Sequence, residues 1–488
     1  MKSGTAVGRM ILAVGLLATV QPAAANNIAV TNVVLMNQTV ITRTVDVQFD
    51  LSWENSWRCA ATDPAYTNWD AAWVFVRIKD TAGNWQPATL STNRADHTAA
   101  ANSTIDPASD GTGAFVYRSG DLSGGKVAYT GTRLRWNYGT DGYSFADGAV
   151  VTVSVQAIEM VYVPQGSFCV GSGGTESGSF TDGAWGGAPN ATIPFRITNE
   201  AALLITNAAG NLWGTGTGNA TSGPPGLLSA NFPKGYNAFY CMKYELTQGQ
   251  YTDFLNKLTA TQASNRYSSA STGQRYTIGT NSVGGFTNGA PDRACNYLSW
   301  ADGQAYADWA GLRPMTELEF EKACRGPATP VANENAWGTT TKNATTAIVN
   351  DGTGTDTAIG GNCNYDSCSP DGPYRVGIYA AVSSDRTQAG ATYWGIMEMS
   401  GNLAERPVSV GTTASRLFTG LHGNGKLTGS GAADVSNWPT DGAGLRGGEW
   451  YLASSCTRVS DRGFAALAST SRTYDHAGIG WRGVRSAP

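Results

Sequence analysis

The chain has 488 residues, of which 14% are charged, and its formal net charge is −4 at pH 7. This weak acidity gives no reason to expect nucleic acid or an anionic membrane surface as a partner. The length suits two or three domains, and 61 glycines with 15 tryptophans indicate a loop-rich protein with large aromatic side chains.

The first 25 residues have the pattern of a secretory signal peptide. Positive residues at the start are followed by an apolar run over 10–20 and by alanines at 23–25, which fit a cleavage site before Asn26. The apolar run is too short to span a membrane as a helix, and no later stretch is long enough. We therefore expect residues 1–25 to be removed and the mature protein to be secreted, extracellular or at the cell surface, without a transmembrane segment.

Export also bears on the cysteines, because disulfides form in oxidising compartments. The eight cysteines all follow the predicted signal peptide: Cys59, Cys169, Cys241, Cys295, Cys324, Cys363, Cys368 and Cys456. Their even number favours disulfides over metal binding, although the connectivity cannot be deduced. A local Cys363–Cys368 bridge and a Cys169–Cys241 bridge are two candidates.

Residues 26–157 are predicted to form an all-β sandwich of immunoglobulin-like type. Apolar side chains alternate with polar ones from Val45 to Trp53, which is the period of a half-buried strand, and 73–78 and 150–155 read as further strands. Clusters of Gly, Asn and Asp separate these strands, and no helical pattern appears. Such a domain usually packs or spaces other parts, so we expect no catalysis in it.

From residue 158 the pattern changes to mixed helices and strands. The segment 171–235 is rich in Gly, Thr and Asn and is predicted to be a long surface insertion. Three helices are then predicted from capping residues, the first starting at Thr247 with Gln250 as its partner. Ser299 is expected to cap the second helix, and Thr316 with Glu319 to cap the third.

Six segments in this order resemble the sulfatase-modifying-factor family, which contains the formylglycine-generating enzyme. They read MVYVPQGSF, KYELTQGQYTDFLN, LSWADGQAYADWAGLRPMTELEFEKACRG, GIMEMSGNLAE, LRGGEW and GIGWRGVR, and they lie between residues 158 and 486. The resemblance implies that residues 158–488 form an α+β, C-type-lectin-like domain, held together by loops and calcium, behind the β-sandwich.

The oxidase activity of that family depends on two cysteines that bind copper after the double-glycine turn. Counted from Gly447-Gly448, those positions hold Leu452 and Thr457 here, and Cys456 is one residue away. Two thiolates suit copper(I), whereas one thiol does not make the pair. We therefore expect no copper.

A related branch of the family uses non-haem iron, which needs several histidines or two histidines with a carboxylate. This chain has only His97, His422 and His476, without a helical spacing between them. We therefore expect no iron either.

Structural calcium is the metal that the resemblance does imply. In EMSGNLAE, Glu398 and Glu405 would supply carboxylates while Gly401 and Leu403 present backbone carbonyls, and hard oxygen ligands of this kind suit calcium. The family usually has Asp or Asn where Glu398 stands. A second site would map near Asn364 and Asp371, in a loop that is shorter here. The other interpretation of Glu398 and Glu405 is two solvated glutamates.

The region after the double-glycine turn lines an exposed groove in this family and is the predicted ligand-binding surface. Tyr, Trp and Arg carry much of the contact energy at interfaces. The candidates are Trp450, Tyr451, Arg458, Arg472, Tyr474, Asp475 and His476. A structural role is the alternative for Trp450, Arg458, Arg462 and Trp481, and Arg446 and Arg462 are expected to hold buried hydrogen bonds at the turn.

These observations lead to a main hypothesis and a rival. The main hypothesis is a secreted non-catalytic protein that acts in extracellular recognition or as a structural subunit of a cell-surface layer or appendage. It would self-associate through an edge strand at 27–41 or bind a glycan or protein ligand. The alternative is a divergent oxidoreductase of the formylglycine-generating type that acts on a protein cysteine, which would require a further thiol close to Cys456.

Overall fold

The fold is taken from a computed structural model of the chain. It describes residues 4–9, 28–61, 67–143, 145, 148–183, 193–269, 273–366, 368–381, 384–441, 443–467, 471–473 and 478–488. Within these ranges no helix is long and apolar enough to cross a membrane.

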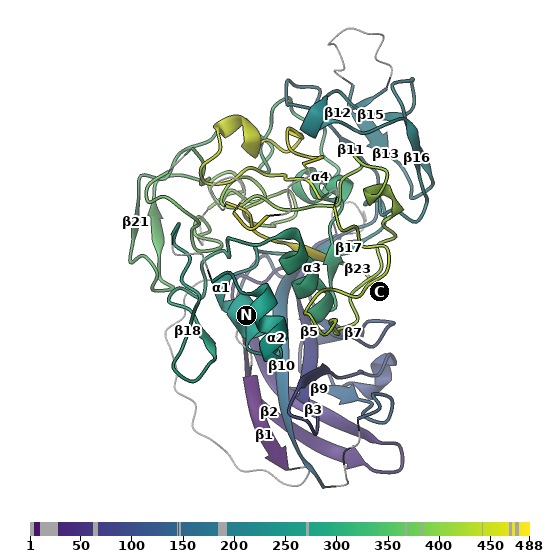
Figure 1. Cartoon of the computed structure of the whole chain (residues 1–488), viewed down its shortest axis with the longest axis vertical. Coiled ribbons are helices and arrows are strands. Elements are labelled where there is room, and N and C mark those ends of the chain that lie inside the picture. The colour runs from purple at the N-terminus through teal and green to yellow at the C-terminus, as the bar shows by residue number, and fades with distance from the viewer. Residues whose placement is uncertain are drawn as a thin grey trace.

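One large sheet runs through the molecule and joins the N-terminal part to the C-terminal part (Figure 1). Its order is β20 (Arg313–Pro314), β23 (Gly483–Ser486), β17 (Phe239–Met242), β10 (Val150–Val163), β5 (Asn68–Lys79), β8 (Ala114–Arg118) and β7 (Ser103–Pro107). Three further strands attach to it: β1 (Gly4–Arg9) on β10, and β4 (Arg58–Cys59) and β6 (Trp85–Pro87) on β5.

A second sheet packs on one face of the large sheet and completes the predicted sandwich. It consists of β2 (Ala29–Thr39), β3 (Thr44–Trp53) and β9 (Val127–Trp136) in that order. The inward residues of β3, from Val45 to Trp53, pack with Val74 and Val76 of β5, as their alternation predicts. β2 is the edge strand of this sheet, in the segment where an edge strand was expected.

The central strands β5 and β10 are buried on both faces, because they serve two cores. Alternate residues of β5 divide between them: Val74 and Val76 face the sandwich core, while Trp73 and Phe75 face the core of the C-terminal part. Antiparallel pairing of β5 with β10 runs from Val153 opposite Ile78 to Val161 opposite Asp70. The expected boundary between residues 157 and 158 therefore lies inside a continuous strand, and the two parts share one sheet.

The helices begin where the capping residues predict. Thr247, Ser299 and Thr316 each accept a hydrogen bond from the backbone three residues later, and a capping box is complete in each case. The helices are α1 (Gln248–Leu255), α2 (Ala260–Arg266), α3 (Trp300–Trp309) and α4 (Glu317–Arg325); α2 was not predicted.

The segment 171–235, predicted as a surface insertion, contributes to the core. Its short strands are β12 (Phe180–Asp182), β13 (Phe195–Ile197), β14 (Leu203–Ile205), β15 (Leu212–Gly214) and β16 (Gly226–Leu228), and β11 (Phe168–Val170) pairs with β13. Phe180, Leu212 and Phe232 are buried in the same core as α1 and α3. The contribution of this segment to the core could not be predicted from the sequence. Its apolar residues are sparse among glycines, and each strand is too short to show a periodic pattern.

Two small hairpins and four short 3-10 helices complete the described structure. The hairpins are β18 (Gly279–Thr280) with β19 (Phe286–Thr287), and β21 (Ala347–Val349) with β22 (Thr357–Ile359). The 3-10 helices are η2 (Arg94–Asp96), η3 (Gly218–Ala220), η4 (Ser415–Leu417) and η5 (Ser454–Thr457). Within the predicted signal peptide, β1 pairs with the first half of β10 in register from Gly4 opposite Val155 to Arg9 opposite Val150.

A buried charge network fastens α4 to the loop around Gly447-Gly448. Glu317 accepts hydrogen bonds from Arg446 at 2.9 Å and from Arg462 at 2.7 Å. One turn later on α4, Glu321 accepts from Arg446 at 2.7 Å and from Arg325 at 3.1 Å. The expected buried hydrogen bonds of Arg446 and Arg462 are therefore confirmed.

We predict that Glu317→Gln strongly destabilises the protein. Burial raises the pKa of Glu317, but the adjacent Arg462 and Arg446 outweigh it, so the net pKa is lowered and the carboxylate is charged. Neutralising it leaves buried guanidinium groups without their counter-charge, which costs about 3–5 kcal/mol of unfolding free energy. Denaturant titration followed by tryptophan fluorescence measures this loss.

Asp121→Asn is the matched control, because Asp121 pairs with Arg58 at 2.9 Å but is 56% exposed. Its expected cost is about 0–1 kcal/mol. Equal small losses for both variants would contradict the importance of the network.

Candidate active site

The double-glycine turn places two loops against each other. Gly447 and Gly448 both have positive φ, 85° and 68°. A Cβ on Gly448 would lie 2.9 Å from the carbonyl carbon of Cys456, and one on Gly447 would lie 2.7 Å from Oε2 of Glu405. Glycine is therefore required at both positions for the 449–457 loop and the 398–405 loop to approach this closely.

Three buried glutamates meet under these loops with one arginine. Glu405 accepts a hydrogen bond from Nε of Arg482 at 3.0 Å, and Glu398 accepts one from the backbone of Gly377 at 2.7 Å. Glu245 accepts from the backbone of Leu403 at 2.8 Å and from the side chain of Asn402. Burial raises the pKa of all three carboxyl groups, in Glu398 and Glu405 to about 7 despite the opposing effect of Arg482.

The expected calcium ligands have their oxygens free for a cation. Oε2 of Glu398 and Oε2 of Glu405 are buried without a hydrogen-bond partner. In the described part of the chain, no donor reaches the carbonyl oxygens of Gly401 and Leu403. Two carboxylates and two carbonyls fit a hard cation, whereas no cluster of three or more His, Cys, Asp or Glu side chains suited to a metal occurs among the described residues. The interpretation of Glu398 and Glu405 as solvated glutamates is wrong, since both are buried.

The two residues of the second expected calcium site, Asn364 and Asp371, differ in their burial. Asn364 is buried, and its Oδ1 has no hydrogen-bond partner, while its Nδ2 donates to Gly372 at 3.1 Å and to Asn402 at 3.2 Å. Asp371 is exposed. Asn402 thus connects this loop to Glu245. Of the expected pair, only Asn364 is buried as a metal ligand would be.

Neither of the two candidate disulfides is formed, since Cys169, Cys241, Cys363 and Cys368 are free thiols. Cys363 is buried with its Sγ 3.1 Å from the carbonyl of Ser400, and burial raises its pKa. Cys368 donates to the carbonyl of Tyr365 at 2.9 Å and lies beneath the same loop. Cys169 is half-buried, whereas Cys241 is buried beside Met242 on β17.

The two positions of the missing copper ligands lie at this thiol-bearing loop. The carbonyl of Leu452 accepts from the backbone of Asp366 at 3.0 Å. Thr457 is buried; its carbonyl accepts from Ser400 at 2.6 Å, and its hydroxyl contacts Asn335 at 2.8 Å. A leucine and a threonine do not supply the sulfur ligands that copper(I) prefers, so the residues present do not fit the copper pair.

Lys342 lies between the 449–457 loop and the loop that carries Cys363 and Cys368, and its ammonium group contacts both loops. Its Nζ donates to Thr457 at 3.0 Å and to the carbonyl of Ser454, and lies 5.1 Å from the centre of the Tyr365 ring. Burial lowers the pKa of Lys342, and the nearby Cys363 and Cys456 oppose that effect. One ammonium group is therefore close to both thiols, and Cys456 is the half-buried one.

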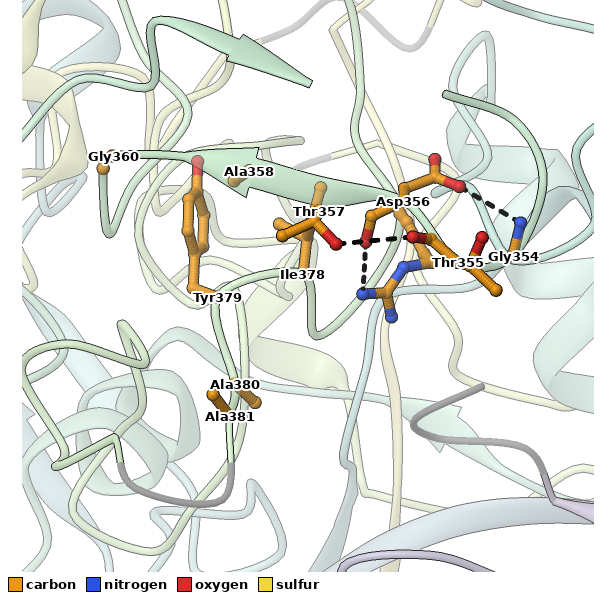
Figure 2. A pocket seen from close by; sticks show the side chains of 12 residues that line it. Gly354, Thr355, Asp356, Thr357, Ala358, Gly360, Ile378, Tyr379, Ala380 and Ala381 are labelled. Carbon is orange, nitrogen blue, oxygen red and sulfur yellow. Dashed lines mark hydrogen bonds between the residues drawn. The ribbon is translucent and has the colours of Figure 1, made fainter. Parts of the chain in front are cut away.

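A cavity of about 510 Å³ opens next to the strand β22 (Figure 2), and its lining includes Gly361, two residues before Cys363, but no cysteine. Tyr379 lines the cavity, and its hydroxyl is 2.7 Å from that of Thr345. Burial raises the pKa of Tyr379, and Cys363 and Cys368 raise it further. The cavity is lined by Gly354, Thr355, Asp356, Thr357, Ala358, Gly360, Gly361, Arg375, Ile378, Tyr379, Ala380 and Ala381. Arg375 donates to the carbonyl of Asp356 at 2.9 Å.

The predicted ligand surface is only partly assembled. Tyr451 is 43% exposed beside the turn, but Trp450 is 2% exposed and packs with Tyr244 and Leu403 in the core. Arg458 donates to Asn333 at 3.1 Å. Arg472 is bound to Asp302 of α3 and to backbone carbonyls of α2. The other three candidates, Tyr474, Asp475 and His476, lie outside the described residues.

The histidines do not form an iron site among the described residues. Nδ1 of His97 accepts from the backbone of Arg135 at 3.1 Å, while Nε2 lies 2.9 Å from the carbonyl of Ser91. Nε2 of His422 accepts from the backbone of Ser486 at 3.0 Å. Both imidazole rings form hydrogen bonds with backbone groups, and His476 is outside the described residues.

Together, the fold and the site define a β-rich domain with few helices, in which loops carry buried carboxylates and thiols. A family model described as the sulfatase-modifying factor enzyme 1-like domain matches residues 148–487, and the chain belongs to this family. The chain is also similar to hercynine oxygenase of Mycolicibacterium thermoresistibile, with 28% identity over 176 residues. That match covers 35% of this chain and 32% of the oxygenase, so the chain spans about a third of that relative's length.

These comparisons correct the main functional hypothesis. A secreted non-catalytic protein for recognition or for a surface layer was expected because the copper cysteines are absent. The relative that matches is an oxygenase, and the family model describes an enzyme-like domain, so the non-catalytic hypothesis is wrong and the oxidoreductase alternative fits better.

Sequence reasoning missed Lys342, the placement of Cys363 and the role of Glu245. Glu245 lies inside a matched segment, KYELTQ, and is an acidic residue next to a predicted buried strand, which is a usable signal. Lys342 lies in a loop without any pattern. Its proximity to two thiols depends on three separate loops and has no local signal.

We predict that the calcium-free protein loses stability as the pH rises. Because the pKa of Glu398 and Glu405 is about 7 instead of 4.5, the folded protein holds protons that the unfolded chain releases. This contribution is fully present below pH 4.5 and is lost as the pH rises through about 7. If calcium binds here, it binds the ionised carboxylates, so the melting temperature should rise on calcium addition, and more at about pH 8 than at about pH 5.

Glu398→Gln should abolish most of the calcium effect, whereas Glu54→Gln, in the sandwich, should leave it unchanged. Thermal melting in chelator and in calcium measures both variants. A calcium shift of the same size at both pH values, or in both variants, would argue against binding at these carboxylates.

Proposed function

We propose that this chain is a divergent oxidoreductase of its family that acts on a cysteine of a protein or peptide, with Cys456 as the reacting thiol. The observation that carries the proposal is the position of Lys342, whose ammonium is close to the half-buried Cys456 and to Cys363. The similarity to an oxygenase supports a redox reaction.

The electrostatics favour Cys456 over the other thiols. A thiol reacts as its thiolate, which nearby positive charges stabilise and burial in apolar surroundings opposes. Lys342 and Arg458 provide positive charge at this loop. Cys363 is buried and its pKa is raised, so it stays protonated at neutral pH. Cys456 is therefore the better nucleophile.

The proposed step is thiol–disulfide exchange. The Cys456 thiolate attacks one sulfur of a substrate disulfide, a new sulfur–sulfur bond forms, and the other substrate sulfur leaves as a thiolate that takes up a proton. The substrate disulfide is reduced and Cys456 is oxidised to a mixed disulfide. No step passes through copper or iron, because Leu452, Thr457 and the described histidines do not fit those metals.

The cavity in Figure 2 provides room for the substrate, and its lining residue Gly361 is two residues from Cys363 in the sequence. Its lining mixes small residues, such as Thr355, Thr357 and several glycines and alanines, with Ile378 and Tyr379, which suits a peptide segment with a small apolar side chain. In this proposal the peptide lies along the β22 side of the cavity, and its sulfur reaches the loop of Cys456.

Four further properties belong to this proposal. The C-terminal part has the C-type-lectin-like topology, which its short helices and loop-borne contacts support. Calcium at Glu398, Gly401, Leu403 and Glu405 is structural and supports the loops of the site. Residues 1–25 direct secretion, which the charge and apolar pattern support, and the edge strand β2 is the contact if copies associate.

We predict that the reduced protein forms a mixed disulfide with a peptide disulfide at Cys456. Cys456→Ser should remove the adduct seen by mass spectrometry. Cys59→Ser is the matched control, because Cys59 is exposed in the sandwich and should leave the rate unchanged. An unaltered adduct in Cys456→Ser, or no adduct in the native protein, would refute the proposal.

Lys342→Met should slow the exchange at neutral pH by about tenfold and shift its pH–rate profile to higher pH, because the cation that favours the thiolate is lost. Lys342→Arg should restore the native profile. A uniform loss of rate without a shifted profile would indicate only a structural role for Lys342.

A further inference from the structure

A second cavity, of about 240 Å³, lies where the sandwich meets the C-terminal part. Its walls come from the β5–β6 hairpin, from the connection between α1 and α2, and from the loop at 425–427. These three segments are far apart in the sequence, and neither Lys342 nor any of the thiols lines the cavity. The cavity is thus separate from the candidate active site.

Lys257 in this cavity lacks a counterpart for its charge. The residue is only 8% exposed, yet it lines the cavity, and no hydrogen-bond acceptor among the described residues reaches its ammonium group. Its Nζ lies 5.5 Å from the centre of the Trp85 ring. Burial lowers the pKa of Lys257, Asp253 opposes this effect and Arg77 adds to it. The Lys257 ammonium therefore reaches the cavity without a partner among the described residues and is available to pair with an anion there.

The surrounding charges favour an anion. Lys79 lies 5.4 Å from the centre of the same Trp85 ring, and Lys426 is at the rim. The nearest hairpin carboxylate, Asp80, is already used: it accepts from the backbone of Ala82 and Asn84 and from the side chain of Gln86.

Two other charged groups at this junction are also occupied. Asp308 accepts from the backbone of Asn424 and of Asp434, both at 2.9 Å. Arg77 donates to the carbonyls of Gly425 and Trp309. Asp253 and the three lysines are therefore the charges that remain, and the sum is positive.

The rest of the lining suits a sugar ring rather than a purely apolar acid. Asn84, Gln86 and Gln262 offer amides for hydroxyl groups, and the backbone at Gly83 and Gly425 comes close to the cavity. The half-buried indole of Trp85 provides an apolar face, whereas Trp309 is buried beneath Arg77. At 240 Å³ the cavity is slightly below the usual range for drug-sized ligands, which starts at about 300 Å³, and it suits one ring.

We propose that this cavity binds a hexuronic acid unit, whose carboxylate pairs with Lys257 and whose pyranose ring lies against Trp85. The site is independent of the redox proposal, because it uses none of its residues. A free uronate and the end of an acidic glycan share this chemistry, and the two sources are distinguished by comparing glucuronate with a uronate oligosaccharide.

The test is titration of the full chain, followed by tryptophan fluorescence and calorimetry. Glucuronate should bind with a stoichiometry of one, and glucose at least about tenfold more weakly, because it lacks the charged group. Lys257→Met should weaken glucuronate binding by about tenfold or more at unchanged melting temperature. Lys257→Arg should retain binding, and Lys126→Met, an exposed lysine of the sandwich outside the cavity, should behave like the native protein.

Equal affinity for glucose and glucuronate, no binding at millimolar glucuronate, or full binding by Lys257→Met would overturn the proposal. Equal affinity for glucuronate and simple acetate would overturn the sugar part, because the ring would then contribute nothing. Tighter binding of the oligosaccharide than of glucuronate would support a glycan end as the ligand, and equal binding would support the free uronate. Loss of this binding would leave the Cys456 exchange reaction intact, so the two proposals fail separately.

Discussion

The buried charge network on α4 is the interaction on which the C-terminal part depends. Glu317 and Glu321 lie one turn apart on the helix and bind Arg446, Arg462 and Arg325, which come from distant loops or from the helix end. Buried ion pairs add little net stability when complete but are expensive to break. The network therefore selects one arrangement of long loops that would otherwise have many alternatives.

The same loops hold the buried carboxyl groups and the thiol-bearing segment. Among the carboxyl groups, the negative charge exceeds the positive charge. Arg482 faces three buried carboxyls, Glu245, Glu398 and Glu405, so a cation there would complete the balance. Ser400 in this loop is also bonded to Thr457, at the thiol site. The geometry of the buried carboxyl groups and that of the thiol-bearing loop are thus linked, since both depend on how the 398–405 loop lies against the 449–457 loop.

The sandwich is more than an appended module. Because β10 continues from one part into the other, and because Trp73 of β5 donates to the carbonyl of Ala310 at 2.7 Å, the two parts pack as one body around a shared sheet. The junction buries Arg77 and leaves the cavity that Lys257 lines. The cavity is polar because polar side chains of both parts line this junction.

The sequence by itself determined the features that depend on neighbouring residues. The alternation from Val45 to Trp53 predicted the inward face of β3, and the caps at Thr247, Ser299 and Thr316 predicted three helix starts. The segment EMSGNLAE predicted Glu398 and Glu405 as calcium ligands, and each has one buried carboxylate oxygen without a hydrogen-bond partner. Only the tertiary structure decided that Trp450 is buried, that neither candidate disulfide is formed and that Lys342 lies near two thiols. The physical reason is distance along the chain: caps and periodicity act within a few residues, whereas burial and electrostatic proximity depend on loops brought together by the whole fold.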